Sequence, residues 1–168
     1  VQECREMCIL PEALINYLVL LGWSPGDDQE IMTGEEMIKL FSLERVSRNP
    51  AIYDLDKLIW LNGHYLRTME LHIITERALP FFQKKSEIWA ACQKSRYKIE
   101  EVVNLVRDRV KTLVEIVDAS AYFYCEDFPY DEKEVKKHFS SKDTANVLRK
   151  AAEVLEIVEP FTEDVIKK

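Results

Sequence analysis

The 168-residue sequence contains little glycine and proline and has no long apolar run. Only four glycines and six prolines leave little room for disorder or for a sheet of many strands. Because the glycines are spread from Gly22 to Gly63, neither a P-loop nor a GxGxxG sequence can be formed. The longest apolar run, Ala13 to Leu21 with Asn16 inside it, is about half of the roughly 20 residues that a membrane helix needs. We therefore expect a soluble protein without a membrane span or a visible targeting segment.

Cysteine is also scarce, and its spacing excludes two kinds of stabilising site. Cys4 and Cys8 are one helical turn apart, and the other two cysteines stand alone, which is not the pattern of a disulfide scaffold. None of the four cysteines and three histidines has partners at CxxC-like spacing, so we expect no metal site. Reduced thiols indicate the cytosol or an organelle matrix.

The charge of the chain is unevenly distributed. A net charge of −7 argues at first against nucleic acid, because lysine and arginine drive binding to phosphates. The segment from Arg77 to Lys111, however, contains nine basic residues and only four acidic ones. This segment could face RNA while the remainder repels it; the alternative is a set of solvated helix faces.

The first half of the chain predicts three helices. Pro11 starts a helix that is apolar nearly all round and ends near Gly22, so we expect it to be buried on most sides. Thr33 and Glu36 form a capping box for a short helix, and residues 43–53 are expected to be extended. Asp54 caps a helix over residues 55–65, in which Gly63 is expected to mark the end.

The second half predicts further helices. One runs from residue 69 to about 79, and Pro80 starts or kinks the next, which continues to residue 93. Apolar residues at steps of three and four predict a single amphipathic helix over residues 99–117, with basic residues on its other face. An aromatic connection over residues 118–130 could stack bases or simply pack on the helices, and two more helices begin near Asp131 and Ser141. We therefore expect an all-α fold.

No catalytic constellation is visible. Adjacent carboxylates such as Glu35-Glu36, Glu100-Glu101 and Glu126-Asp127 lack a neighbouring histidine, so we interpret them as surface charge.

Three blocks of sequence resemble one family. Residues 10–14 are LPEAL, residues 41–58 (FSLERVSRNPAIYDLDKL) are similar to FSLERVSKSPAxFDxxKL, and residues 60–67 (WLNGHYLR) are similar to WLNGxYIR. In this order and spacing they resemble bacterial or organellar glutamyl-tRNA synthetases, and the resemblance continues more loosely after Arg67.

This resemblance implies a fold and a function. The fold would be a stem-contact helical fold at 1–68, a first α-helical anticodon-binding subdomain at 69–160, and the start of a truncated second subdomain at 161–168. The family joins glutamate to its tRNA with ATP and magnesium, in a catalytic domain that precedes this region. We therefore expect a fragment without catalytic, cofactor-binding or metal residues, inactive by itself. The resemblance implies a cytoplasmic monomer with glutamate tRNA as its partner and no membrane partner.

The same resemblance suggests which residues touch RNA. Basic side chains of the stem-contact fold could touch backbone phosphates, and those around residues 96–111 could approach the anticodon stem or loop. The expected tRNA-binding residues are Arg45, Arg48, Lys57, Arg67, Arg96, Lys98, Arg107, Arg109 and Lys111.

Two departures from the family pattern are visible. Cys8 stands where the family usually has glycine. Glu100 and Glu101 stand where some members carry an arginine that helps to discriminate the third anticodon base, and a carboxylate cannot replace that donor. Glutamine tRNA therefore stays an open second partner.

Two rival functions are open. A helical protein-interaction module would show contiguous exposed apolar surface and associate without salt dependence. An independent enzyme would need a nucleophile, a base and a stabilising group together, and the sequence shows no such set.

Overall fold

The computed structural model describes residues 2–26, 28–47, 51–125, 130–141, 143–160, 162 and 166. The chain divides into two compact units, Val1–Asp127 and Phe128–Lys168. Each unit is described below by itself.

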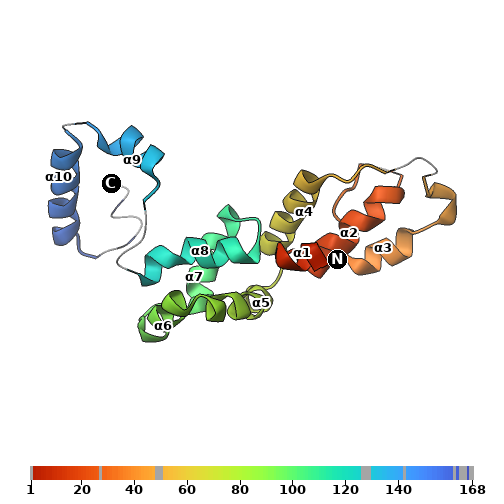
Figure 1. The fold of residues 1–168 in the computed structure, drawn as a ribbon, viewed down its shortest axis with the longest axis horizontal. Helices are drawn as coiled ribbons and strands as arrows, with labels where there is room; N and C mark the ends of the chain where they lie inside the picture. Colours follow the sequence, from red (N-terminus) through yellow and green to blue (C-terminus); the bar gives the residue numbers. More distant parts are fainter. Residues whose placement is uncertain are drawn as a thin grey trace. The chain divides into compact units, whose positions relative to one another are not determined.

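The described residues form α-helices, two short 3₁₀ helices and one isolated antiparallel bridge between Trp23 and Val46, which confirms the all-α prediction (Figure 1). The helices of unit 1 are α1 (Gln2–Glu6), α2 (Pro11–Gly22), α3 (Gly34–Leu40), η1 (Leu43–Arg45), α4 (Leu55–Thr68), α5 (Leu71–Lys84), α6 (Ser86–Lys94), α7 (Ile99–Val106), η2 (Arg107–Arg109) and α8 (Leu113–Tyr124). Unit 2 contains α9 (Glu132–Phe139) and α10 (Thr144–Ile157). None of the helices described is long and apolar enough to cross a membrane.

Helices α2 and α3 begin as the sequence predicts. Pro11 occupies the first turn of α2, and the predicted capping box at the start of α3 is formed, with Thr33 and Glu36 bonded to each other's backbone N–H groups. Helix α2 is less buried than expected, because the side chains of Ile15 and Leu18 are about half exposed.

Helix α4 is longer than expected. Asp54 caps it by accepting a hydrogen bond from the backbone N–H of Lys57, as predicted, but the helix continues to Thr68. The interpretation of Gly63 as a helix end is therefore wrong: Gly63 lies inside α4 and is buried. Gly63 has no side chain, and the backbone of Lys111 lies close to it.

The helices after residue 69 differ from the prediction at two breaks. Pro80 lies inside α5, and the chain turns at Lys85 instead. The single helix expected over residues 99–117 is interrupted by η2 and a short turn, because Thr112 caps a new helix by accepting a hydrogen bond from the backbone N–H of Glu115. The apolar period survives the break, since Val106, Val110 and Leu113 are all buried.

Two other segments expected to be irregular contain helix. Residues 43–45 form η1 within the stretch expected to be extended. Helix α8 extends to Tyr124, so the aromatic connection begins later than expected, and its residues 126–129 lie outside the described residues.

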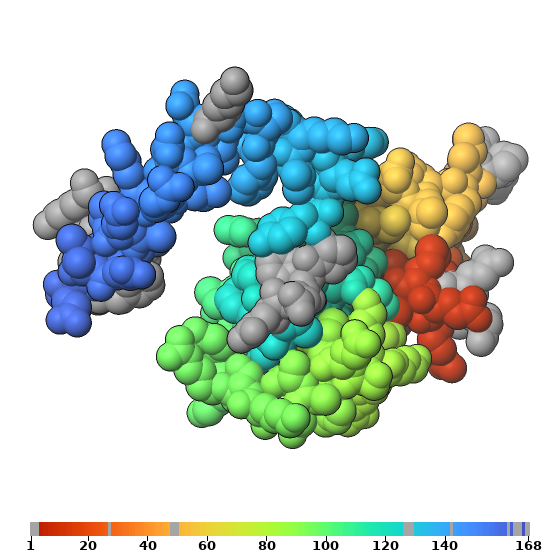
Figure 2. Space-filling view, turned by 60° about the vertical axis from the view of Figure 1, so that its left-hand side comes forward, coloured from red at the N-terminus to blue at the C-terminus, as the bar shows by residue number. Residues whose placement is uncertain are grey.

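Two hydrophobic clusters are buried in the described part of unit 1: a small one of Trp23, Met32 and Met37, and a much larger core. The larger core contains fully buried side chains from α2, α4, α5, α7 and α8, including Leu58, Phe82, Val103 and Ile116. Figure 2 shows α5, α6 and α8 as one continuous surface, from lime green to teal. Residues on both sides of position 68 contribute to this core. The subdomain boundary that the sequence predicts at position 68 stays a prediction.

In unit 2, the two predicted helices are present. Asp131 caps α9 by accepting hydrogen bonds from the backbone N–H groups of Lys133 and Glu134. Helix α10 lies beside α9 and ends before Pro160, close to the predicted end (Figure 1).

Candidate nucleic-acid interface

Helix α4 and the loop before α8 lie close together at Gly63. A Cβ atom built on Gly63 would lie 3.3 Å from the Arg67 Nη1 atom, 3.4 Å from the Lys111 Cγ atom and 3.6 Å from the Lys111 Cα atom. The missing side chain of Gly63 thus leaves room for two cationic side chains to meet on one surface of α4.

Two more arginines lie on η2, just before Lys111 in the chain. Helix η2 packs against α4, and the Arg107 Nη1 atom donates a hydrogen bond to the Met69 carbonyl oxygen over 3.1 Å, just after the end of α4. Arg109, on the same 3₁₀ helix, is exposed. We call Arg67, Arg107, Arg109 and Lys111 the basic junction.

The basic junction is not neutralised by ion pairs. Among the described residues, none of its four side chains lies within 4 Å of a carboxylate oxygen. The nearest acidic residues along the chain are Glu70, Asp108 and Glu115. The carboxylate of Glu115 accepts the backbone N–H of Lys111 over 2.7 Å. The junction therefore presents positive charge to any anion that approaches it.

His64, one turn before Arg67 on α4, adds no charge at neutral pH. Burial lowers the pKa of its imidazole, and the positive charge of Arg67 lowers it further. A neutral imidazole at this position can donate and accept hydrogen bonds.

The other cations expected to touch tRNA lie elsewhere in unit 1. The guanidinium of Arg45 donates a hydrogen bond to the Pro25 carbonyl oxygen and lies against Gly26. The ammonium of Lys57, near the start of α4, pairs with Glu30 over 2.6 Å, which offsets its charge locally.

The loop between α6 and α7 forms a second, smaller basic site. The Arg96 guanidinium lies over the Tyr97 ring, 4.8 Å from its centroid, and both side chains are exposed. Lys98 is also exposed, and its backbone N–H donates to the Glu101 carboxylate over 3.2 Å. Glu101 thus caps the start of α7, a structural reason for a carboxylate at this position.

The nine expected residues therefore separate into groups. Four form the basic junction, two lie beside Tyr97, two hold local contacts in η1 and at the start of α4, and Arg48 lies outside the described residues. The amphipathic helix that was expected to carry five of them does not exist as one helix. Its break matters, because the break turns Lys111 and Arg107 toward the end of α4.

Sequence reasoning missed Asn62, the residue that holds this arrangement. Its side chain is fully buried, and its Nδ2 atom donates to the Lys111 carbonyl oxygen over 2.5 Å. Its Oδ1 atom accepts the backbone N–H of Leu10 over 2.7 Å. The only signal for it in the sequence is a polar residue among the apolar positions of a helix.

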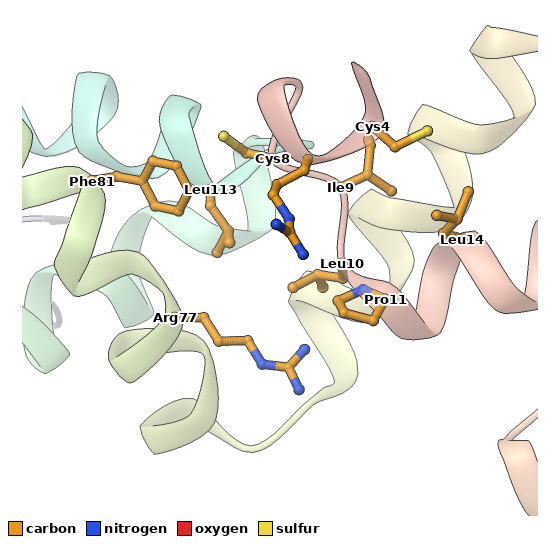
Figure 3. A pocket seen from close by; sticks show the side chains of 10 residues that line it. Cys4, Cys8, Ile9, Leu10, Pro11, Leu14, Arg77, Phe81 and Leu113 are labelled. Atoms are coloured by element: carbon orange, nitrogen blue, oxygen red, sulfur yellow. The ribbon is translucent and has the colours of Figure 1, made fainter. Parts of the chain in front are cut away.

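Unit 1 also contains a cavity of about 520 Å³ between α1, α2, α5 and α8 (Figure 3). Most of its lining is apolar, and the guanidinium of Arg77 on one side is bound to both carboxylate oxygens of Glu12, at 2.6 and 2.7 Å. This pairing lowers the pKa of the Glu12 carboxyl group. The cavity is lined by Cys4, Arg5, Cys8, Ile9, Leu10, Pro11, Leu14, Arg77, Phe81 and Leu113.

The cavity lining offers little for catalysis. Burial raises the pKa of the Cys8 thiol, so this group is not an activated nucleophile, and no histidine lines the cavity. Across the part of the chain that the structure describes, no three His, Cys, Asp or Glu side chains are grouped so that they could hold a metal ion.

Comparison with known proteins shows the family of the chain. The family model described as anticodon binding domain matches residues 73–168, more than half of the chain. The chain belongs to the anticodon-binding domain family. A second family model, described as the catalytic domain of class I tRNA synthetases (E and Q), matches residues 1–60. The anticodon-binding match therefore comes after this match in the chain.

Curated relatives confirm the resemblance to bacterial glutamyl-tRNA synthetases. A glutamate–tRNA ligase of Caldanaerobacter subterraneus is 48% identical over 162 residues, which cover 96% of this chain and 33% of the relative. One of Thermoanaerobacter pseudethanolicus is 45% identical over 172 residues, which cover 100% of this chain and 36% of the relative. The chain thus spans about a third of the length of these relatives.

Solved structures also match this fold. A crystal structure of a glutamate tRNA ligase from Elizabethkingia meningosepticum, in complex with its amino acid, superposes with a TM-score of 0.76 at 30% identity over 98% of this chain and 31% of that chain. A glutamate–tRNA synthetase from Elizabethkingia anophelis gives a TM-score of 0.74 at 27% identity over the same shares.

Proposed function

We propose that this anticodon-binding chain binds glutamate tRNA through the basic junction, as the RNA-binding portion of a glutamate–tRNA ligase. The observation that carries the proposal is the convergence of Arg67 and Lys111 over Gly63, with Arg107 bonded to the carbonyl group just after α4 and Arg109 exposed on the same 3₁₀ helix. Four cations without carboxylate partners at one site suit a phosphate backbone, because each can neutralise one phosphate and release a counterion.

The loop between α6 and α7 suits a different contact. An exposed arginine stacked on an exposed tyrosine offers a planar surface on which an unpaired base can stack, while Lys98 supplies charge beside it. We propose that the basic junction positions the RNA and that Arg96 and Tyr97 meet unpaired nucleotides.

The chemistry of the ligase belongs to the rest of the parent enzyme in this proposal. The parent would join glutamate to tRNA with ATP and magnesium in its catalytic domain. The described residues of this chain do not fit those cofactors: they hold no group of side chains suited to a metal ion, and the sequence has no glycine-rich phosphate loop. We propose that the chain alone is catalytically inactive, and that the parent works in the cytoplasm as a monomer.

A titration tests the RNA-binding proposal. The chain is titrated with glutamate tRNA, glutamine tRNA and an unrelated tRNA at about 50 and about 200 mM salt. If the four junction cations each neutralise one phosphate of a duplex stem, the slope of log K against log salt is about −3.6, or roughly a 150-fold loss between the two salt concentrations. A higher affinity for glutamate tRNA than for the unrelated tRNA would support the proposal. Equal affinities for glutamate tRNA and glutamine tRNA would mean that the chain does not distinguish these two.

Matched variants locate the site. Lys111→Ala is expected to reduce the magnitude of the salt slope by about 0.9, because one phosphate contact is lost. The control is Lys39→Ala on α3, an exposed lysine outside the expected set, which should leave affinity and slope unchanged. Absence of binding to every tRNA at low salt would refute RNA binding by this chain.

The rival proposal is a helical protein-interaction module. Its supporting observation is the exposed apolar surface of α2, α3 and η1, where Ile15, Ile38 and Leu43 are at least half exposed. That module would associate with a protein partner independently of salt, so the two-salt titration also separates the two functions.

A further inference from the structure

We propose that Asn62 is a positioning residue that joins the start of α2 to the loop of Lys111 and thereby places the basic junction. This inference rests on the proposed tRNA binding. A single buried amide thereby couples the region that resembles a synthetase catalytic domain to the anticodon-binding helices.

Both polar atoms of the Asn62 side chain are used. The Oδ1 atom accepts the backbone N–H of Leu10 over 2.7 Å, and the Nδ2 atom donates to the carbonyl oxygen of Lys111 over 2.5 Å. Asn62 is 0% exposed and Leu10 is 1% exposed. Water therefore cannot easily replace either hydrogen bond, and an unsatisfied backbone group here would be costly.

Asn62 and its two hydrogen-bond partners lie in different parts of the chain with respect to the two matching family models. Leu10 lies within the residues 1–60 that match the synthetase catalytic domain, and Lys111 lies within the residues 73–168 that match the anticodon-binding domain. Asn62 lies in the interval between the two matches and reaches both. One side chain thus forms hydrogen bonds to the backbone of both regions.

The hydrogen bond from Asn62 to the Lys111 carbonyl group fixes the part of the loop that carries the Lys111 side chain. Lys111 is in the short turn between η2 and α8, where no helical hydrogen bond holds its carbonyl group. Asn62 supplies the missing donor, and the adjacent Gly63 lets the Lys111 side chain lie beside the guanidinium of Arg67. The bond from Arg107 to the Met69 carbonyl is a second tie from the same loop to α4.

Loss of Asn62 should therefore displace Lys111 without removing it. The loop would relax from α4, and the four cations would no longer face one stretch of phosphate backbone. The expected signature is a smaller salt slope, not merely a less stable protein.

The test compares Asn62→Ala with Asn16→Ala in this 168-residue chain. Asn16 is the matched control because it is also a fully buried asparagine of unit 1, with hydrogen bonds to the Glu30 carbonyl, the Met32 N–H and the Tyr65 hydroxyl, and none to the basic junction. Affinity for glutamate tRNA is measured at several salt concentrations, at a temperature at which circular dichroism shows both variants folded.

Asn62→Ala is expected to bind glutamate tRNA roughly tenfold more weakly at about 50 mM salt, with a salt slope smaller in magnitude by about one to two. Lys111→Ala should weaken binding less in the Asn62→Ala background than in the unaltered chain, because the two changes act on the same contact. Asn16→Ala should keep the affinity and the slope of the unaltered chain.

Three results would overturn the inference. One is wild-type affinity and slope for Asn62→Ala, and another is an equal loss for Asn16→Ala, which would make the effect one of stability alone. The third is additive behaviour of Asn62→Ala and Lys111→Ala. Absence of tRNA binding by the unaltered chain would instead refute the proposed function, and this inference with it, before any variant is compared.

If Asn62→Ala does not fold, Asn62→Leu replaces it, with Asn16→Leu as control. Leucine is close to asparagine in size, carries no charge and has no donor for the Lys111 carbonyl, so the same outcomes decide.

Discussion

Replacing Gly63 by alanine should stabilise the protein and weaken its RNA binding at the same time. Gly63 lies inside α4, where glycine is about 0.8–1.0 kcal/mol less favourable than alanine. The added Cβ atom would lie 3.3 Å from the Arg67 Nη1 atom, which is tight, and 3.4 and 3.6 Å from two Lys111 atoms, which is ordinary contact. The tight contact involves the far end of a flexible side chain, so the guanidinium can move away.

The net effect follows from these contacts. Moving an exposed or half-buried arginine tip costs a few tenths of a kcal/mol, so Gly63→Ala should raise the free energy of unfolding by about 0.5–1 kcal/mol. The midpoint of thermal unfolding should rise by roughly 1–4 °C for a chain of this size. Because Arg67 is displaced from the basic junction, affinity for tRNA should fall by a small factor, about two- to fivefold.

Tryptophan fluorescence during urea unfolding measures the stability change. All three tryptophans, Trp23, Trp60 and Trp89, lie in unit 1, so the signal reports that unit alone. Gly63→Val is the contrasting variant, because its γ carbons would press on the Lys111 backbone and should cost about 1–3 kcal/mol. Destabilisation by Gly63→Ala of more than about 1 kcal/mol would refute the reasoning, since it would mean that the loop cannot yield.

Three further predictions concern single side chains of unit 1. Cys8 has a φ of 60°, so Cys8→Gly should be about 1 kcal/mol more stable than Cys8→Ala in urea unfolding, because only glycine adopts this conformation without strain. The Arg77 guanidinium lowers the pKa of Glu12 in the folded state, so this pair stabilises the fold above the usual pKa of glutamate and the contribution is lost as pH falls through the lowered value. Glu12→Gln should therefore lower the free energy of unfolding, measured with urea at pH 7, by no more than about 1 kcal/mol, since both groups are partly exposed, and the difference should disappear once the pH is below the lowered pKa of Glu12. Arg67→Ala should raise the pKa of His64 in an NMR titration but leave it below its usual value, because burial is the larger cause of the shift; an unchanged pKa would mean that the two side chains are not neighbours.

Local signals in the sequence predicted most of the helices. Pro11, the Thr33–Glu36 capping box, Asp54 and Asp131 all stand where the structure begins a helix, because capping depends on residues close in the chain. Predictions were wrong where a distant contact decided. Gly63 lies within α4, which packs against both α2 and η2, and Pro80 lies within α5 between Ala78 and Phe82, which are buried in the core.

The candidate site shows the same division. The excess of basic residues between Arg77 and Lys111 was visible in the sequence, and the expected set includes all four residues of the basic junction. Their grouping was not visible, because Arg67 and Lys111 are 44 positions apart and meet only through the fold. Periodicity also misled, since one continuous helix over residues 99–117 would have placed the cations on a single straight face.

The sequence alone determined the all-α class, the family resemblance and the identities of the candidate cations, because these depend on composition, local capping and conserved spacing within blocks of a few residues. The tertiary structure decided which cations act together and what holds them. Asn62 could bridge Leu10 and Lys111 only after three segments had packed into one core, and that packing depends on contacts between residues that are far apart in the chain.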